Sequence, residues 1–291
     1  KSAGPGDTID QRLDTGTPLY KRFWHPLAVA ALNTACDEAT ARLLWPVVAE
    51  TVLKGGRNCR PLVARNGLSE SFIDPTVQWL TERGSSLTLG ARLRSLEIVD
   101  NKLVSLDFSG DRRVPAPGAT ILALPPASAQ RALPGLQTPQ ESRAIVNGHF
   151  RVTDYPLPSL PFQSPLIGIL GGTAEWLFLR GDVVSITVSA ADALAELDEA
   201  TIAARMWADI VQTLRLPRDA ALPTCRIVKE KRATFAQTPA EERRRAATVT
   251  PYRNLFLAGD WTDTGLPATI EGSIRSGYAA AAAVVKLQHS R

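Results

Sequence analysis

The segment spanning residues 254–277 constrains the fold of this chain more than any other part of the sequence. Its apolar run at 255–258 is typical of a buried strand. Gly259 and Asp260 follow, where the backbone must turn sharply and another group must come close. After a polar loop, Pro267 is suited to the first position of a helix, since its fixed φ fits and no hydrogen bond is lost there. The pattern predicts a strand, a tight turn, a loop and a helix.

The predicted helix carries two stripes of different character. Gly272, Ser276 and Ala280 form a stripe of small residues. The other stripe is larger and apolar, and it consists of Ile270, Ile274, Tyr278, Ala281 and Val285. Because small side chains allow a close approach, we expect the first stripe to lie against a sheet or a flat ligand.

The start of this helix has the chemistry of an anion-binding site. The backbone N–H groups of Ala268, Thr269 and Ile270 are expected to lack partners within the helix, so they favour negative charge. The carboxylate of Asp260, at the end of the strand, is suited to accept hydrogen bonds from sugar hydroxyls. From the residues alone, the arrangement is either a cofactor site or an ordinary strand–loop–helix crossover.

Apolar periodicity elsewhere predicts a mixed α/β chain. Residues 1–65 have helical spacing, and a further helix is expected over 69–83. The predicted strands are 87–93, 103–108, 119–124, 144–152, 175–179 and 183–188. An amphipathic helix follows them, with its apolar stripe at Leu194, Leu197, Ile202, Met206 and Ile210. Because residues 119–124 form a short continuous apolar run, we expect that strand to be buried on both faces.

The charge distribution gives no support for nucleic-acid binding. The 33 basic and 29 acidic residues leave a net charge of only +4. The densest basic run, 243–245, follows two glutamates and is typical of a solvated surface. No stretch reaches the roughly 18 consecutive apolar residues that a membrane span needs. We therefore expect neither a nucleic-acid partner nor a membrane-spanning helix.

The cysteines and histidines argue against several classes of site. Cys36, Cys59 and Cys225 are odd in number and far apart, which indicates a reducing compartment such as the cytoplasm. The three histidines are equally scattered, and the sequence contains no HExxH, GxSxG or GxxxxGK[ST] motif. Metalloprotease, serine hydrolase and P-loop NTPase functions are unsupported, and no metal site is expected.

Residues 256–277 closely resemble the closing FAD motif of flavin amine oxidases and phytoene desaturases. The resemblance implies FAD as cofactor, with Gly259 and Asp260 against its ribityl or pyrophosphate part. It implies that the N1/O2 edge of the isoalloxazine is faced by Pro267, Ala268, Thr269 and Ile270. It also implies that the backbone of Leu93 contacts the adenine.

Further segments resemble one branch of this superfamily, the hydroxysqualene dehydroxylases, also called squalene-associated FAD-dependent desaturases. These segments are 23–34, 55–57, 65–69, 145–150 and 230–236. The branch implies a long isoprenoid substrate and reductive dehydroxylation of hydroxysqualene to squalene, a step of squalene and hopanoid biosynthesis. A protein acid would assist the loss of water, and reduced flavin would deliver hydride.

The resemblance implies an α/β fold with two parts. Residues 66–126 and 226–291 would complete, discontinuously, a partial FAD-binding Rossmann-like domain of the glutathione-reductase-2 type. Residues 1–65 and 127–225 would form an α+β substrate domain. The family begins with a βαβ unit that carries GxGxxG, and this motif is absent here. We therefore expect a fragment that lacks about 130 residues of the family architecture and that binds FAD poorly by itself.

Other residues are candidates with weaker signals. Trp24, Trp176 and Phe235 would line an apolar tunnel for the substrate, although buried aromatic residues are usually core. His149 and Asp154 are candidates for the general acid, with a structural role as the alternative. Lys231 and Arg232 would face the flavin or pair with Glu230.

Two other functions remain open at this level. One is a desaturase or amine oxidase that uses the flavin in the oxidative direction, and the other is a non-catalytic fragment without flavin. For an isoprenoid enzyme we expect peripheral contact with the inner membrane surface, because squalene-like compounds dissolve only in bilayers. The oligomeric state is left open.

Overall fold

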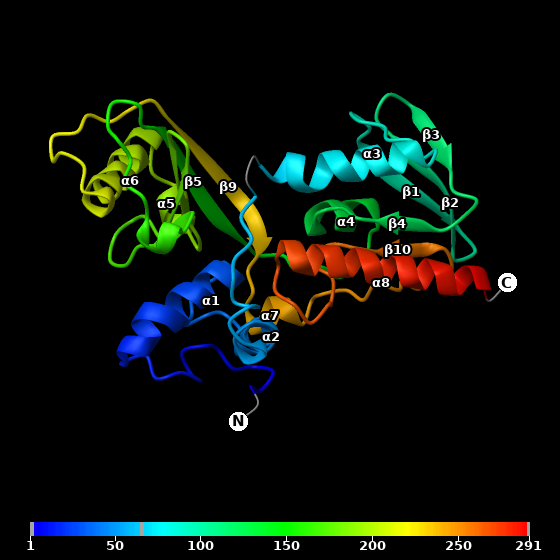
Figure 1. The fold of residues 1–291 in the computed structure, drawn as a ribbon. Helices are drawn as coiled ribbons and strands as arrows, with labels where there is room; N and C mark the ends of the chain where they lie inside the picture. Colours follow the sequence, from blue (N-terminus) through cyan, green and yellow to red (C-terminus); the bar gives the residue numbers. More distant parts are fainter. Residues whose placement is uncertain (1–2, 65–66, 290–291) are drawn as a thin grey trace.

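The computed structural model describes residues 3–64 and 67–289 (Figure 1). Residues 65 and 66, at the start of one segment of the expected resemblance, lie outside the described residues. The α-helices are α1 (His25–Leu32), α2 (Ala41–Glu50), α3 (Asp74–Glu82), α4 (Pro126–Ala132), α5 (Asp192–Ala195), α6 (Glu199–Leu214), α7 (Pro239–Glu242) and α8 (Ile270–His289). Within these residues, no helix is long and apolar enough to cross a membrane.

In the described part of the chain the strands form three separate sheets. One is antiparallel, in the order β6-β7-β8-β5-β9. Its strands are β5 (Ser142–Arg151), β6 (Leu166–Gly168), β7 (Trp176–Arg180), β8 (Val183–Val188) and β9 (Cys225–Phe235). The second is the antiparallel meander of β1 (Leu93–Val99), β2 (Lys102–Phe108) and β3 (Arg112–Pro115). The third is the parallel pair β4 (Thr120–Leu122) and β10 (Leu255–Leu257).

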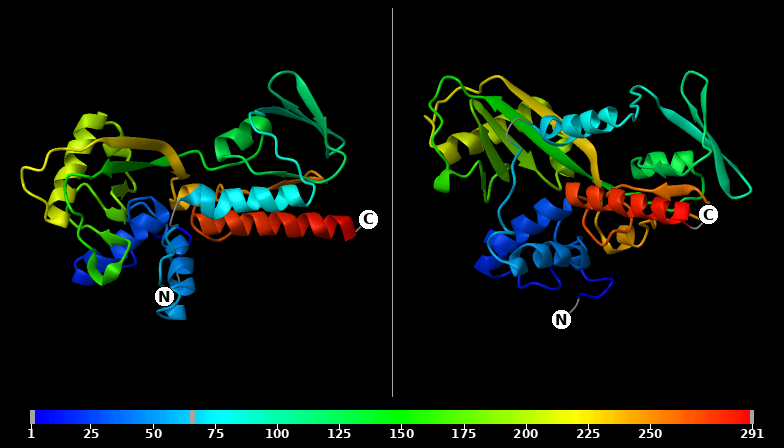
Figure 2. Two further views of the ribbon diagram at one scale, coloured as in Figure 1. Left: turned by 45° about the horizontal axis from the view of Figure 1, so that its top comes forward. Right: turned by 45° about the vertical axis from the view of Figure 1, so that its right-hand side comes forward.

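The five-stranded sheet is covered on one face by α6. Alternate residues of β5 are buried, among them Val146 and Phe150, and they pack with Met206 and Ile210 of α6. Gly148 lies so close to α6 that an added Cβ would meet the Met206 sulfur at 2.6 Å. The predicted strands at 144–152, 175–179 and 183–188 are confirmed with small shifts of their ends. The single helix expected after them is divided into α5 and α6, because Asp198 caps the start of α6 by accepting a hydrogen bond from the Thr201 amide. The long strands β5 and β9 run from this sheet toward the start of α8 (Figures 1 and 2).

The meander confirms one predicted strand and corrects another. Asp100 and Asn101, both with positive φ, form the turn between β1 and β2. The alternation at 87–93 does not produce a strand until Leu93. The ladder between β1 and β2 begins at the pair Leu93–Phe108, where β2 ends, so residues 87–92 have no strand to pair with.

The parallel pair β4–β10 is fixed by a buried asparagine. Asn254 accepts a hydrogen bond from the Leu103 amide at 2.8 Å and donates to the Leu103 and Gly118 carbonyls, both at 2.9 Å. Strand β10 is fully buried, as predicted. The expectation that 119–124 is buried on both faces is wrong, because Ile121 is 41% exposed. A two-stranded sheet leaves one side of β4 without a neighbouring strand.

Helix α8 begins at Ile270, three residues later than predicted, because Pro267 belongs to the preceding loop. Its small stripe of Gly272, Ser276 and Ala280 is buried, as expected. The stripe packs on β10, and the Ser276 hydroxyl accepts a hydrogen bond from the Gly259 amide at 2.8 Å. The larger apolar stripe faces outward.

The helices of the first half follow the predicted spacing. Pro26 lies in the first turn of α1, where it is tolerated, and Pro46 lies inside α2. The helix expected over 69–83 consists of a π-helical turn, Ser69–Ile73, followed by α3. In Figure 1, α1 and α2 lie below the five-stranded sheet, and α4 is drawn between α3 above and α8 below.

Candidate functional site

The turn after β10 is built on a glycine and a buried tryptophan. Gly259 has φ +141°, and an added Cβ would meet the Trp261 indole nitrogen at 2.7 Å. Trp261 is almost fully buried, and its Nε1 donates to the Leu124 carbonyl at 2.8 Å. A larger residue at 259 would therefore force the indole away from the end of β4.

Asp260 lies on the wall of a cavity of about 760 Å³. The cavity is bounded by the start of α4, the start of β5, the end of β9 and Ser273 of α8. Burial raises the pKa of the Asp260 carboxyl, against the charge of Arg245 and the Trp261 amide. Within residues 3–64 and 67–289, no side chain donates a hydrogen bond to this carboxylate. A partly desolvated carboxylate without a side-chain donor suits a ligand that brings hydroxyl groups.

The amides before α8 differ from the prediction in one respect. The Ala268 amide donates to the Gln237 side-chain oxygen at 3.0 Å, so it is not free for a ligand. The amides of Thr269 and Ile270 have no hydrogen-bond acceptor among the described residues. The expected set of three free N–H groups is therefore reduced to two, because a side chain distant in sequence occupies the first.

Arg245 was missed by the sequence analysis, which treated the basic run 243–245 as solvated. Arg243 and Arg244 are exposed, but Arg245 is 8% exposed. Its guanidinium donates to the carbonyls of Asp260, Thr262 and Leu266 and to the Thr264 hydroxyl. Burial lowers its pKa, and its Nε has no partner within the described chain. Arg245 thus holds the whole loop that carries Asp260.

The residues expected to line a substrate tunnel lie in three places. Phe235, the last residue of β9, is on the wall of the Asp260 cavity and 5.4 Å below the Arg245 guanidinium. Trp176 is on β7, opposite Gly168 and Thr187. Trp24 lines a separate cavity next to α2. The structure therefore brings only Phe235 together with Asp260.

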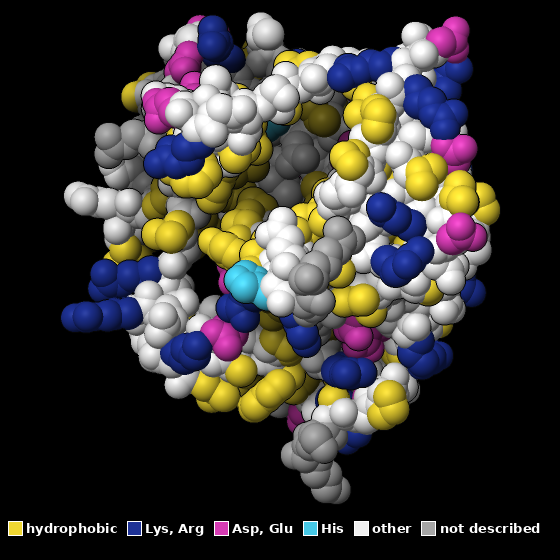
Figure 3. Space-filling view, turned by 90° about the vertical axis from the view of Figure 1, so that its right-hand side faces the viewer, with side chains coloured by type: hydrophobic (Ala, Val, Ile, Leu, Met, Phe, Trp, Pro, Cys, Tyr) yellow, Lys and Arg dark blue, Asp and Glu magenta, His cyan; other side chains and the backbone are white. Residues whose placement is uncertain are grey.

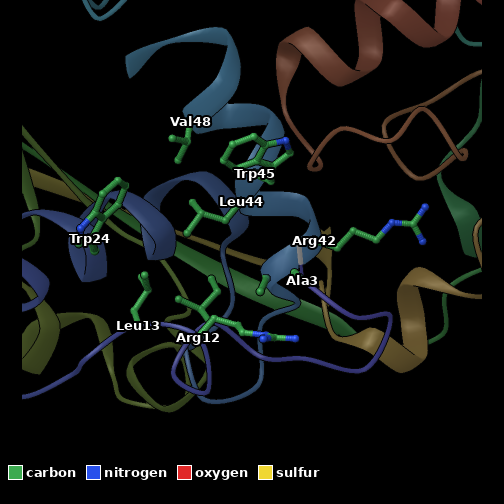
Figure 4. Close-up of a pocket in the computed structure, with 10 residues that line it drawn as sticks. Ala3, Arg12, Leu13, Trp24, Arg42, Leu44, Trp45 and Val48 are labelled. Carbon is green, nitrogen blue, oxygen red and sulfur yellow. The ribbon is translucent and has the colours of Figure 1, made fainter. Parts of the chain in front are cut away.

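The cavity beside Trp24 is largely apolar and lies between residues 3–13, Trp24 and α2. Its volume is about 650 Å³. In Figure 4, Trp24 is on one side, Trp45 and Val48 are on the other, and Leu44 lies between them. Arg42 extends away from Trp24 toward Glu242, with 3.6 Å between nitrogen and oxygen.

The two candidate acids lie on or beyond β5. The His149 Nδ1 is 2.9 Å from the Ser185 hydroxyl, and burial lowers the pKa of His149, helped by Arg180 and Arg226. Asp154 is exposed in the loop after β5 and accepts a hydrogen bond from Thr153 at 3.2 Å. His149 is seven residues from Ser142, which lines the Asp260 cavity, or about 23 Å along an extended strand.

The remaining predicted residues have local partners. Leu93 begins β1, and its side chain packs against the core around Leu103. Lys231 pairs with Glu196 at 2.8 Å. The Arg232 amide donates to Glu230 at 3.2 Å, and Arg232 lines the Asp260 cavity.

Comparison with known proteins gives matches over nearly the whole of this chain. The family model described as flavin containing amine oxidoreductase matches residues 3–285. The hydroxysqualene dehydroxylase of Rhodopseudomonas palustris is 46% identical over 278 residues, which are 95% of this chain and 64% of that protein. That of Sinorhizobium fredii is 43% identical over 280 residues, 96% of this chain and 66% of that protein. The chain spans slightly less than two thirds of the length of these relatives.

The fold is also found among solved structures. An oxidoreductase from Methanosarcina mazei superposes with a TM-score of 0.68 and 14% identity, covering 95% of this chain and 68% of that one. This likeness shows the fold alone. Together with the family match, it confirms the expected α/β flavoprotein fold.

Proposed function

Because this chain belongs to the flavin containing amine oxidoreductases, we propose that it forms most of an FAD-dependent hydroxysqualene dehydroxylase. The observation that carries the flavin site is the partly buried Asp260 carboxylate, which faces a cavity and has no side-chain donor. The substrate is proposed from the two relatives that bear this name.

The residues around the cavity fit the polar parts of FAD. Gly259 and Asp260 would hold the ribityl or pyrophosphate part, with Asp260 accepting hydroxyl hydrogens. Pro267 and Ala268 would shape the segment in which the Thr269 and Ile270 amides meet the ring edge. The backbone of Leu93 is proposed against the adenine.

The proposed reaction replaces an allylic hydroxyl by hydrogen. When bound in its reduced form, FAD would supply the hydride and the two electrons that it carries. A protein acid supplies a proton to the hydroxyl, the carbon–oxygen bond breaks, water leaves, and a new carbon–hydrogen bond forms at that carbon. The protein excludes bulk water from the site, which preserves the cationic carbon until the hydride arrives.

His149 and Asp154 stay the proposed acids, and Trp24, Trp176 and Phe235 the proposed substrate contacts. Because burial lowers the pKa of His149, a role as acid predicts that activity falls as pH rises through a range below 6.5. Because the proton and the hydride act at the same carbon, His149 or Asp154 can serve as the acid only if the flavin ring extends from the Asp260 cavity toward β5.

We also propose the domain division and the membrane contact. Residues 66–126 and 226–291 would form the flavin domain, which is supported by the parallel pairing of β4 with β10. Residues 1–65 and 127–225 would form the substrate domain. We propose a cytoplasmic enzyme in peripheral contact with the inner membrane. The contact is supported by Trp45, which lines the Trp24 cavity, and by Leu53, which follows α2, because both expose large apolar side chains.

The proposal is tested on a purified protein that contains this chain and is extended to the full length of its relatives. We expect flavin absorbance near about 450 nm and conversion of hydroxysqualene to squalene when a reductant is added. A colourless protein would exclude the flavoenzyme. A yellow protein that produces no squalene but oxidises an isoprenoid or an amine would assign it to the desaturases or amine oxidases instead.

A further inference from the structure

Three buried polar side chains meet where α1 ends. We call Asn33, Thr34 and Gln237 the polar junction, and their exposed fractions are 3%, 0% and 0%. Asn33 has φ +46° and ends α1 in the left-handed conformation. Buried polar groups require hydrogen-bond partners, so the partners of these three residues define what the polar junction connects.

Asn33 and Thr34 make their contacts away from α8. The Asn33 side chain donates to the Arg143 carbonyl at 3.2 Å and to the Thr234 hydroxyl at 3.0 Å, and it accepts from the Ala190 amide at 2.7 Å. The Thr34 hydroxyl donates to the Leu32 carbonyl at 3.0 Å. These bonds join α1 to the five-stranded sheet.

Gln237 is the member of the polar junction that reaches the segment before α8. Its Nε2 donates to the Leu32 carbonyl at 2.6 Å, and its Oε1 accepts from the Ala268 amide at 3.0 Å. Its backbone is held on both sides, by the Thr34 hydroxyl at 2.9 Å and the Thr40 amide at 2.8 Å. The Gln237 backbone is therefore fixed by Thr34 and Thr40, and its side chain joins the Leu32 carbonyl to the Ala268 amide.

We propose that Gln237 is a positioning residue for the flavin-facing start of α8. By binding the Ala268 amide, it sets the place of the next two peptide groups, Thr269 and Ile270, whose N–H groups have no acceptor in the described chain. The proposal rests on the flavin site proposed above, and it adds the residue that holds those amides in place.

The chemistry of the side chain explains why glutamine is suited to this role. The position requires a donor to a carbonyl and an acceptor from an amide at the same time, and a side-chain amide supplies both while neutral. A carboxylate could not donate to Leu32, and it would place a negative charge beside the amides that are proposed to face the flavin. Gln237 is neutral, so it does not offset the partial positive charge of the Thr269 and Ile270 amides, which stays available to an anionic ligand.

The test compares Gln237→Met with Asn33→Gly in the flavin-loaded protein that carries this chain. Methionine has a similar shape and makes neither hydrogen bond, whereas glycine removes the Asn33 bonds and tolerates its positive φ. Both changes are expected to lower the melting temperature. We expect only Gln237→Met to weaken the preference for reduced over oxidised flavin, by about fivefold, the equivalent of one hydrogen bond. That ratio corresponds to a midpoint potential about 20 mV lower.

A second measurement needs no flavin. Hydrogen exchange of the Ala268 amide should accelerate at least tenfold in Gln237→Met and stay unchanged in Asn33→Gly. If Gln237→Met does not fold, Gln237→Asn, which is one methylene shorter, should show the same changes. Fast exchange of Ala268 in the unmodified protein would overturn the proposal whatever the variants do.

The outcomes separate this inference from the proposed function. If the unmodified protein binds no flavin, the proposed function fails, while the exchange of Ala268 still tests its bond to Gln237. If the protein binds flavin and the two variants have equal potentials, Gln237 is structural only and the inference fails.

Discussion

At the residue scale, two charged side chains lie in surroundings that disfavour their charge. Asp260 belongs to the loop after β10, and Arg245, from the segment before β10, donates hydrogen bonds to that loop. Burial raises the pKa of Asp260 and lowers that of Arg245, although the two charges partly offset each other. Arg245 is compensated by four acceptors of the loop. Asp260 has no comparable compensation, so its carboxylate is the group that a ligand would relieve.

Asp260→Asn should therefore stabilise the ligand-free chain and weaken flavin binding. A raised pKa means that the folded state keeps its proton to higher pH than the unfolded state does, so stability is lost as pH rises from about 3.9 through the folded pKa. The gain in melting temperature from Asn should be absent at the acid end of this range and full at pH 7. FAD should bind about tenfold more weakly, because hydrogen bonds to a charged group are lost.

Asp263→Asn is the matched control, because Asp263 is exposed in the same loop. At pH 7 its melting temperature should not rise, because the Asp263 charge partly offsets the charge of the buried Arg245. A pH-independent gain in Asp260→Asn, or equal gains in both variants, would contradict the assignment of Asp260 as a desolvated carboxylate.

Arg245→Lys should loosen the loop although the charge is kept. An ammonium lacks the planar fork that reaches several carbonyls at once, so we expect a loss of about 2–3 kcal/mol in the free energy of unfolding. Urea denaturation measures it. Arg243→Lys, at an exposed position of the same basic run, should change stability by less than about 0.5 kcal/mol, and equal effects at both positions would refute the role of Arg245.

The site was only partly predictable from sequence for reasons that these residues illustrate. Asp260 follows a buried strand, so local pattern alone placed it at a strand end. Arg245 lies in a run of three arginines whose composition indicates solvent, and only the fold shows that one of them turns inward. Gln237 meets Leu32 across 205 positions and Ala268 across 31, and no local periodicity records such contacts.

At the scale of elements, α8 can lie on β10 because its inner stripe is small. Gly272 packs tightly against the loop that precedes α8, since an added Cβ would meet the Pro267 carbonyl oxygen at 2.5 Å. The stripe and its burial were predicted from sequence, but the first residue of the helix was not. A proline can begin a helix or end a loop, and the tertiary bond from Ala268 to Gln237 decides for the loop.

Gly272→Ala should push the start of α8 away from the loop, lowering both stability and flavin affinity. Gly277→Ala lies in the same helix with nothing within 4 Å of the added Cβ. It should stabilise the chain by about 0.5–1 kcal/mol, because alanine is the better helix former. In thermal unfolding, the melting temperature should fall in Gly272→Ala and rise in Gly277→Ala. A higher melting temperature of Gly272→Ala would refute the close contact.

At the scale of the whole molecule, apolar surface gathers beside the proposed flavin site. Ile270, Ile274, Tyr278 and Val285 of α8 are between 41% and 73% exposed. Seen from the side of the chain's C-terminus, the molecule is hollowed, and hydrophobic side chains surround the hollow (Figure 3). The neighbouring parallel sheet has two strands in the described chain, and such a pair is marginal without further partners.

The exposed apolar stripe of α8 indicates a binding site for the third of the relatives' length that this chain does not span. We expect the segment of the Rhodopseudomonas palustris relative that this chain does not span to bind the chain when both are co-expressed, and to raise its flavin content. Burying the apolar stripe of α8 and adding a strand beside the parallel pair would supply the free energy of association.

The double variant Ile274→Lys, Tyr278→Lys should no longer bind the co-expressed segment, because two charges cannot be buried without partners. Co-purification of the segment with the chain measures this binding. Leu222→Lys is the control, since Leu222 is an exposed apolar residue in the loop before β9, remote from α8 in the fold. Equal recovery of the segment by both variants would show that it binds elsewhere. A chain that binds flavin equally well with and without the segment would show that the corner of Asp260, Thr269 and Ile270 holds the cofactor unaided, and the apolar stripe would then need another occupant.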